Sequence, residues 1–130
     1  MKPAYRMALA GFAGAALGVI GMALAAQNAA PKAYWIANIQ EVKDPETYRN
    51  YTGIVTATLA PYGGQFIVRG AAPVILDKSP KPPGYIVVIE FPSLKNLRDW
   101  WDSETYSKIR PIRERVTVGQ GYAAEGVPPS

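Results

Sequence analysis

Two charged residues in apolar surroundings, Arg69 and Glu90, are the side chains best suited to catalysis. Arg69 ends the segment 65–69, and Glu90 is the one charge in the apolar segment 85–91. We predict that both segments are neighbouring strands, which would place a charged pair at the mouth of a pocket. Arginine can hold a ligand carboxylate through two hydrogen bonds, and a buried carboxylate can accept a proton because burial raises its pKa. The alternative is a structural salt bridge.

Four further residues could bind a ligand. Tyr34 and Asn38 share one face of a predicted strand, and they could either point into a cleft or make hydrogen bonds across a dimer. Trp100 and Tyr106 could form an aromatic wall, with Tyr106 donating a hydrogen bond. The alternative for this pair is packing of a helix on a sheet.

Other polar and aromatic residues favour structural roles. Tyr48 and Tyr51 lie on the apolar face of a predicted helix, so we expect them in the core. Ser103 is expected to cap a helix. The basic run that contains Arg110, Arg113 and Arg115 is typical of a solvated helix face.

The chain contains no histidine and no cysteine. Disulfides, Cys/His zinc sites, histidine- or cysteine-ligated haem and imidazole bases are therefore excluded. The carboxylates do not suggest a metal site, and we expect no cofactor. Any catalysis must come from carboxylates, tyrosines, lysines and arginines.

The order of elements predicts the fold. We expect strand, helix, strand, strand, helix, strand, which is the ferredoxin-like split βαβ arrangement, an α+β fold with an antiparallel sheet and helices on one face. A further stretch of strand is expected at residues 74–76, after an interruption that contains Pro73. The uncovered sheet face of so small a domain is usually buried by a second copy, so we expect a homodimer that forms an α/β barrel.

The first residues are expected to direct export. Lys2 and Arg6 precede an uncharged apolar stretch, and small residues at 23 and 25 fit a cleavage site, so residues 1–25 are typical of a signal peptide. Retained, the segment would be an N-terminal membrane anchor. Residues 26–32 are then a linker, 33–127 the domain and 128–130 a tail. We expect a periplasmic or secreted protein, which would be anchored to the inner membrane if the segment stays.

Cleavage also changes the charge. The full chain carries +4, whereas the 105 residues left after cleavage carry +2. An excess this mild argues against a nucleic-acid partner, which requires a clustered basic face. The intact mass of the native protein separates cleavage from retention, because a mass near 105 residues would exclude the anchor.

Five sequence stretches resemble the domain of unknown function 1330 family, within the dimeric α/β-barrel superfamily. They are AYWIANI, DPETYRNY, YGGQFIVRG, VVIEFPS and WWDSETYSKIRPIRE, and the resemblance covers residues 32–127. The resemblance places Arg69 in the VRG motif and Glu90 in the EFP motif. It implies a ferredoxin-like fold, a dimer and a pocket between sheet and helices, but no activity.

Three functions are consistent with the sequence. The first is an exported domain that binds a small organic ligand in the pocket. The second is a cofactor-independent isomerase or monooxygenase-like enzyme on a small aromatic or lactone substrate, since barrels related to this family include such enzymes. The third is an accessory subunit of a membrane assembly, in which the N-terminal segment stays in the membrane.

Overall fold

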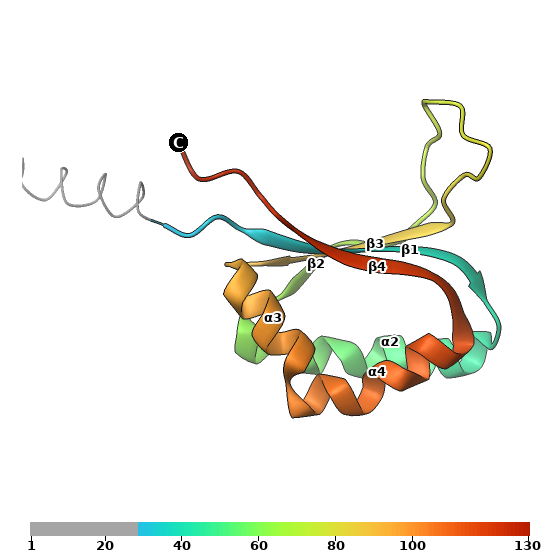
Figure 1. The fold of residues 1–130 in the computed structure, drawn as a ribbon. Coiled ribbons are helices and arrows are strands. Elements are labelled where there is room, and N and C mark those ends of the chain that lie inside the picture. Colours follow the sequence, from blue (N-terminus) through green and yellow to red (C-terminus); the bar gives the residue numbers. More distant parts are fainter. Residues whose placement is uncertain (1–28) are drawn as a thin grey trace, which may run out of the picture. The chain divides into compact units, whose positions relative to one another are not determined.

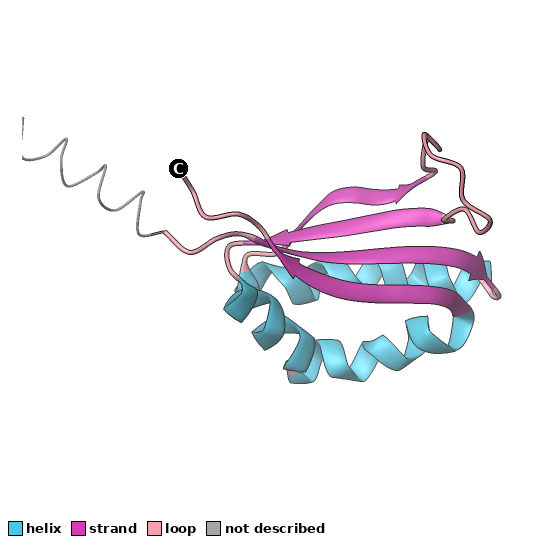
Figure 2. Cartoon of the chain, turned by 45° about the horizontal axis from the view of Figure 1, so that its top comes forward, coloured by secondary structure: helices cyan, strands magenta, loops and turns pink. Residues whose placement is uncertain are grey.

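A four-stranded antiparallel sheet with helices on one face forms the domain (Figures 1 and 2). The computed structural model describes residues 29–130, and residues 31–127 form one compact unit. In chain order the elements are β1 (Ala33–Val42), α2 (Pro45–Leu59), a 3₁₀ turn (Ala60–Tyr62), β2 (Gln65–Ala71), β3 (Tyr85–Phe91), α3 (Leu94–Asp102), α4 (Glu104–Val116) and β4 (Thr117–Glu125).

The strand order is β2-β3-β1-β4, and every neighbouring pair is antiparallel. This is the predicted ferredoxin-like arrangement, so the fold prediction is confirmed. The helical part after β3 is divided at Ser103, whose Oγ accepts a hydrogen bond from Tyr106 N at 3.2 Å. Ser103 therefore caps α4, as predicted.

The core lies between the sheet and the helices. Alternate residues of β1, namely Ala33, Trp35, Ala37 and Ile39, are buried, which is the expected consequence of strand geometry. From the helices, Trp100 and Tyr106 are completely buried, and their rings stack at 3.9 Å between centroids. Trp100 Nε1 also donates a hydrogen bond to Thr58 Oγ1 at 3.0 Å.

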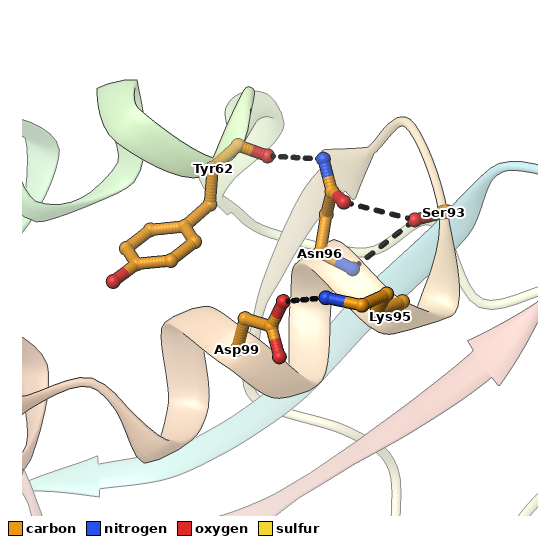
Figure 3. Close-up of polar contacts among 5 residues, drawn as sticks. All are labelled: Tyr62, Ser93, Lys95, Asn96 and Asp99. Carbon is orange, nitrogen blue, oxygen red and sulfur yellow. Dashed lines mark hydrogen bonds and ion pairs between the residues drawn. The ribbon is translucent and has the colours of Figure 1, made fainter.

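The start of α3 is fixed to the end of the α2 region by a small polar cluster (Figure 3). Ser93 Oγ accepts a hydrogen bond from Asn96 N at 3.1 Å, and Asn96 Nδ2 donates to the carbonyl of Tyr62 at 3.1 Å. Lys95 and Asp99 form an ion pair one turn apart at 2.6 Å. These contacts either pair polar backbone groups at the helix ends or join side chains on the surface of α3, so the cluster has a structural role.

The sheet face without helices, here called the open face, carries an apolar row that crosses all four strands. Cross-strand pairing places Val68 opposite Val88, Val88 opposite Ile36, and Ile36 opposite Tyr122. Polar side chains flank this row, among them Asn38. The open face is therefore apolar along its centre and polar on either side.

The predicted strand at residues 74–76 is wrong. Residues 72–84 form a loop that extends beyond the ends of β2 and β3 (Figure 1). Val74 and Leu76 are 84% and 90% exposed, so no neighbouring strand or core buries them. The positive φ of Gly70, at 73°, and the proline at 73 explain why β2 ends at Ala71.

The predicted signal peptide at residues 1–25 and part of the predicted linker lie outside the described residues, so export stays a prediction. Within residues 29–130, none of the helices has the length and apolar character needed to cross a bilayer.

Candidate functional site

A pocket of about 300 Å³ lies between the sheet and helices α2 and α4. Its walls are mainly apolar and aromatic, with a few polar groups. The strands contribute Trp35, Ile39, Phe66, Arg69, Gly70, Val87 and Ile89, α2 contributes Tyr48, Tyr51, Thr52 and Val55, and α4 contributes Arg113.

An irregularity in β2 places two of these side chains on the same wall. In a regular strand, residues three apart such as Phe66 and Arg69 point to opposite faces. The register with β3 shifts between Phe66 and Val68, so that Phe66 lies opposite Ile89 and Arg69 lies opposite Val87. Both partners are core-facing residues, so the bulge turns Arg69 toward the helices.

Arg69 spans the pocket entrance from β2 to α2. Its Nη2 donates hydrogen bonds to the carbonyl of Thr52 at 2.8 Å and to Thr56 Oγ1 at 3.3 Å. Its guanidinium also lies 4.3 Å from the centre of the Phe66 ring. These contacts hold an exposed cation in a defined position at the rim of the pocket.

Arg113 lies on the opposite wall and is partly buried. Its guanidinium is 5.3 Å from the centre of the Trp35 ring, and its Nε is buried without a hydrogen-bond partner among the described residues. Burial opposes the charge, but the electrostatic influence of Tyr106 and Tyr51 outweighs it and raises the pKa of Arg113 above its ordinary value. Arg113 therefore stays positively charged at neutral pH.

Two tyrosines of α2 add hydroxyl groups. The rings of Tyr48 and Tyr51 stack at 6.0 Å, and the Tyr51 and Tyr106 hydroxyls are 3.1 Å apart. Burial is the main cause that raises the pKa of both Tyr48 and Tyr51. Their phenols are therefore protonated at neutral pH and can donate hydrogen bonds into the pocket.

The pocket has no acidic lining residue among those that the structure describes. Its ionisable groups are two guanidinium ions and two protonated phenols, so it can stabilise negative charge but has no group ready to accept a proton. Within residues 29–130 there is likewise no cluster of carboxylates that could hold a metal ion.

Of the predicted site residues, only Arg69 lines this pocket. The predicted ion pair between Arg69 and Glu90 is wrong, because the two side chains lie on opposite faces and at opposite ends of the β2–β3 pair. Glu90 instead pairs with Lys32 at 2.9 Å, and its side chain is 22% exposed. The prediction that β2 and β3 are neighbouring strands is confirmed.

The other four predicted ligand-binding residues also lie outside the pocket. Tyr34 and Asn38 belong to the open face, where Asn38 Oδ1 accepts a hydrogen bond from Gly84 N at 2.8 Å. Trp100 and Tyr106 have no exposed surface and pack in the core. The structure therefore favours the packing alternative for this aromatic pair.

Sequence reasoning missed Tyr48, Tyr51, Thr52 and Arg113 as pocket residues. Arg113 was expected on a solvated face because basic residues surround it. A signal was present, however, since Arg113 follows Tyr106 by seven residues and precedes Val116 by three. Residues at these spacings share one helix face, and Tyr106 and Val116 are both buried.

Comparison with known proteins supports the fold. Residues 32–127 match the model of DUF1330, described as a domain of unknown function. No curated protein matches the chain.

Three similar solved structures share the fold at low sequence identity. A protein of unknown function from Rhodopseudomonas palustris is 12% identical, with a TM-score of 0.59 over 75% of this chain and 83% of that one. A variant of SnoaB, a cofactor-independent oxygenase from Streptomyces nogalater, is 9% identical, with a TM-score of 0.53 over 73% of this chain and 92% of that one. A candidate antibiotic biosynthesis monooxygenase from Nitrosomonas europaea is 13% identical, with a TM-score of 0.50 over 79% of this chain and 96% of that one.

Proposed function

The chain belongs to the DUF1330 family, whose description states no activity, and we propose from the pocket itself that the domain binds a small organic ligand. The observation that carries this proposal is the pocket of about 300 Å³ between the sheet and the α2–α4 pair. Ligand sites are typically concave, mostly apolar and lined by a few well-placed polar groups. This pocket has that composition, and its volume suits a ligand of one or two rings.

The chemistry of the lining favours binding over base catalysis. An isomerase that moves a proton needs a base near the substrate. Glu90, the base expected from the sequence, lies on the open face beside Lys32. The tyrosines in the pocket are poor bases because burial raises the pKa of Tyr48 and Tyr51.

The lining also supports a second candidate, a cofactor-independent oxygenase. Enzymes of this kind need a substrate anion that reacts with dioxygen, and two guanidinium groups could stabilise such an anion if it entered already deprotonated. The SnoaB structure, described as a cofactor-independent oxygenase, shares the fold. Consumption of dioxygen with an acidic diketone would distinguish this enzyme from a domain that releases its ligand unchanged.

Filling the pocket should abolish binding. Thr52 lines the pocket from α2, so Thr52→Trp places an indole in the ligand's space. Ligand at one hundred times its Kd raises the free energy of unfolding of a protein by about 2.7 kcal/mol, which is about 10 °C in Tm for a domain of this size. We expect 1-naphthoate or 1-naphthamide to raise the Tm of the wild-type chain and to leave that of Thr52→Trp unchanged.

The matched control is Ala57→Trp, which adds the same side chain to an exposed position of α2 outside the pocket. It should keep the ligand-induced shift in Tm. A full shift in Thr52→Trp would show that the probes bind elsewhere and would refute the proposed pocket.

We also propose that two copies of the chain pair through the open face. The apolar row that includes Ile36, Val88 and Tyr122 supports this proposal, since a second sheet laid against it would bury these side chains from water. The exposed fraction of Tyr122, which continues this row on the edge strand β4, is 54%, so a large aromatic ring is left open to water. Pairing of this kind would also form the expected barrel.

A further inference from the structure

We propose that the ligand carries a planar oxyanion, either a carboxylate or an enolate, which binds to Arg113 within the pocket and to Arg69 at its rim. This inference rests on the proposed function, because it names the chemical class of the molecule that occupies the same pocket. It differs from the expectation drawn from the sequence, in which Arg69 acted together with Glu90.

The charge of Arg113 is unbalanced. Within the described residues, Arg113 has no ion pair, and the neighbouring carboxylate of Glu114 contacts Arg110 Nε at 3.4 Å instead. The tyrosine hydroxyls and the end of α4 contribute only partial negative charge. A partly buried cation without a counter-ion, and with its Nε buried without a hydrogen-bond partner, is costly, and an anionic ligand in the pocket would offset this cost.

The guanidinium of Arg69 is held in a fixed position. One nitrogen, Nη2, makes both hydrogen bonds to α2, and the Phe66 ring supports the guanidinium from the side. Among the described residues, no carboxylate pairs with this arginine. Arginine has five N–H donors, so donors remain for an oxyanion without any loss of the contacts that position the side chain.

The remaining walls of the pocket suit the body of an anionic ligand. The phenols of Tyr48 and Tyr51 are donors, whereas the pocket offers no carboxylate that would attract a cationic ligand. Trp35, Phe66, Val87 and Ile89 supply apolar surface for the body of the molecule. The pocket thus matches an aromatic or branched apolar body that bears one delocalised negative charge.

The test compares probes of equal shape and different charge on the full-length chain. Calorimetric titration with 1-naphthoate and with neutral 1-naphthamide should show that the anion binds about 10- to 100-fold more tightly, as expected for hydrogen bonds to a charged group. A second anion, 2-hydroxy-1,4-naphthoquinone, presents an enolate in place of a carboxylate, and tighter binding of either anion identifies which oxyanion the pocket prefers.

Substitution of the arginines shows which side chains cause the preference for the anion. Arg113→Met keeps the length of the side chain without its charge and should reduce the preference for anion over amide to less than threefold, whereas Arg113→Lys should keep part of it. Arg115→Met is the matched control, because Arg115 is exposed on the same helix outside the pocket, and it should keep the full preference.

The outcomes separate this inference from the proposed function. Equal affinity for naphthoate and naphthamide would overturn the inference and leave the pocket as a site for neutral ligands. An anion preference that survives both Arg113→Met and Arg69→Met would overturn the assignment to these arginines. Failure of all three probes to bind the wild-type chain would overturn the proposed function itself. The wild-type comparison decides the case even if a variant fails to fold.

Discussion

Replacing Trp100 with alanine is expected to lower the free energy of unfolding by about 3–5 kcal/mol, as is usual for a large aromatic residue in a core. Trp100 has no exposed surface, stacks on Tyr106 at 3.9 Å and packs against Phe91 at 5.3 Å. Alanine would leave a cavity among the four aromatic rings that surround Trp100 and would remove the hydrogen bond that Thr58 Oγ1 accepts from its indole. Urea denaturation followed by circular dichroism measures this loss.

Two companion variants show whether Trp100 is structural or functional. Trp101 is only half-buried, so Trp101→Ala should lower the free energy of unfolding clearly less than Trp100→Ala does. Trp100→Phe should keep a folded domain that binds 1-naphthoate as the wild type does, because Trp100 does not line the pocket. A folded Trp100→Phe variant with no binding, or a Trp100→Ala variant of wild-type stability, would contradict the position that we assign to this residue.

The second large effect concerns association of two copies. Ile36 lies at the centre of the apolar row on the open face, between Val88 and Tyr122. A lysine here would place an unpaired charge in the proposed interface, at a cost of about 3–5 kcal/mol. We expect Ile36→Lys to raise the dimer dissociation constant by more than about 100-fold. Sedimentation equilibrium would show a dimer for the wild type and a monomer for this variant.

Ala57→Lys is the matched control, because it adds the same charge to an exposed position of α2 on the other side of the sheet. This variant should remain dimeric. A wild-type chain that is monomeric at micromolar concentration would contradict the proposed pairing, and so would an Ile36→Lys variant that is folded and still dimeric.

Much of the fold could be predicted because local patterns and packing agree. The alternate residues Trp35, Ala37 and Ile39 form a wholly apolar face of β1, and these residues are buried. The apolar spacing of Tyr51, Val55 and Leu59 likewise defines the buried face of α2. The segment 74–76 has the composition of a strand but finds no partner, and pairing across a sheet is not a local property.

The site was harder to predict because it depends on details of register. Arg69 reaches the helix side only through the bulge between Phe66 and Val68, and a regular β2 would have turned it to the open face. Glu90 lies in an apolar segment, yet alternation from Ile89 places it on the other face, where Lys32 neutralises it. Arg113 was predicted on a solvated face because basic residues surround it in the sequence, although its spacing from Tyr106 matches the buried face of α4.

The most direct test of the account is to map the amide chemical shifts that 1-naphthoate changes in the full-length chain. Two other hollows provide an internal comparison: one between α3 and β4 that includes Arg98, and one on the open face that includes Asn38 and Gln120. We predict that the largest changes occur at Thr52, Gly70 and Val87, which line the pocket between sheet and helices. Changes concentrated in either of the other hollows, or no changes at all, would contradict the proposal that this pocket is the ligand site.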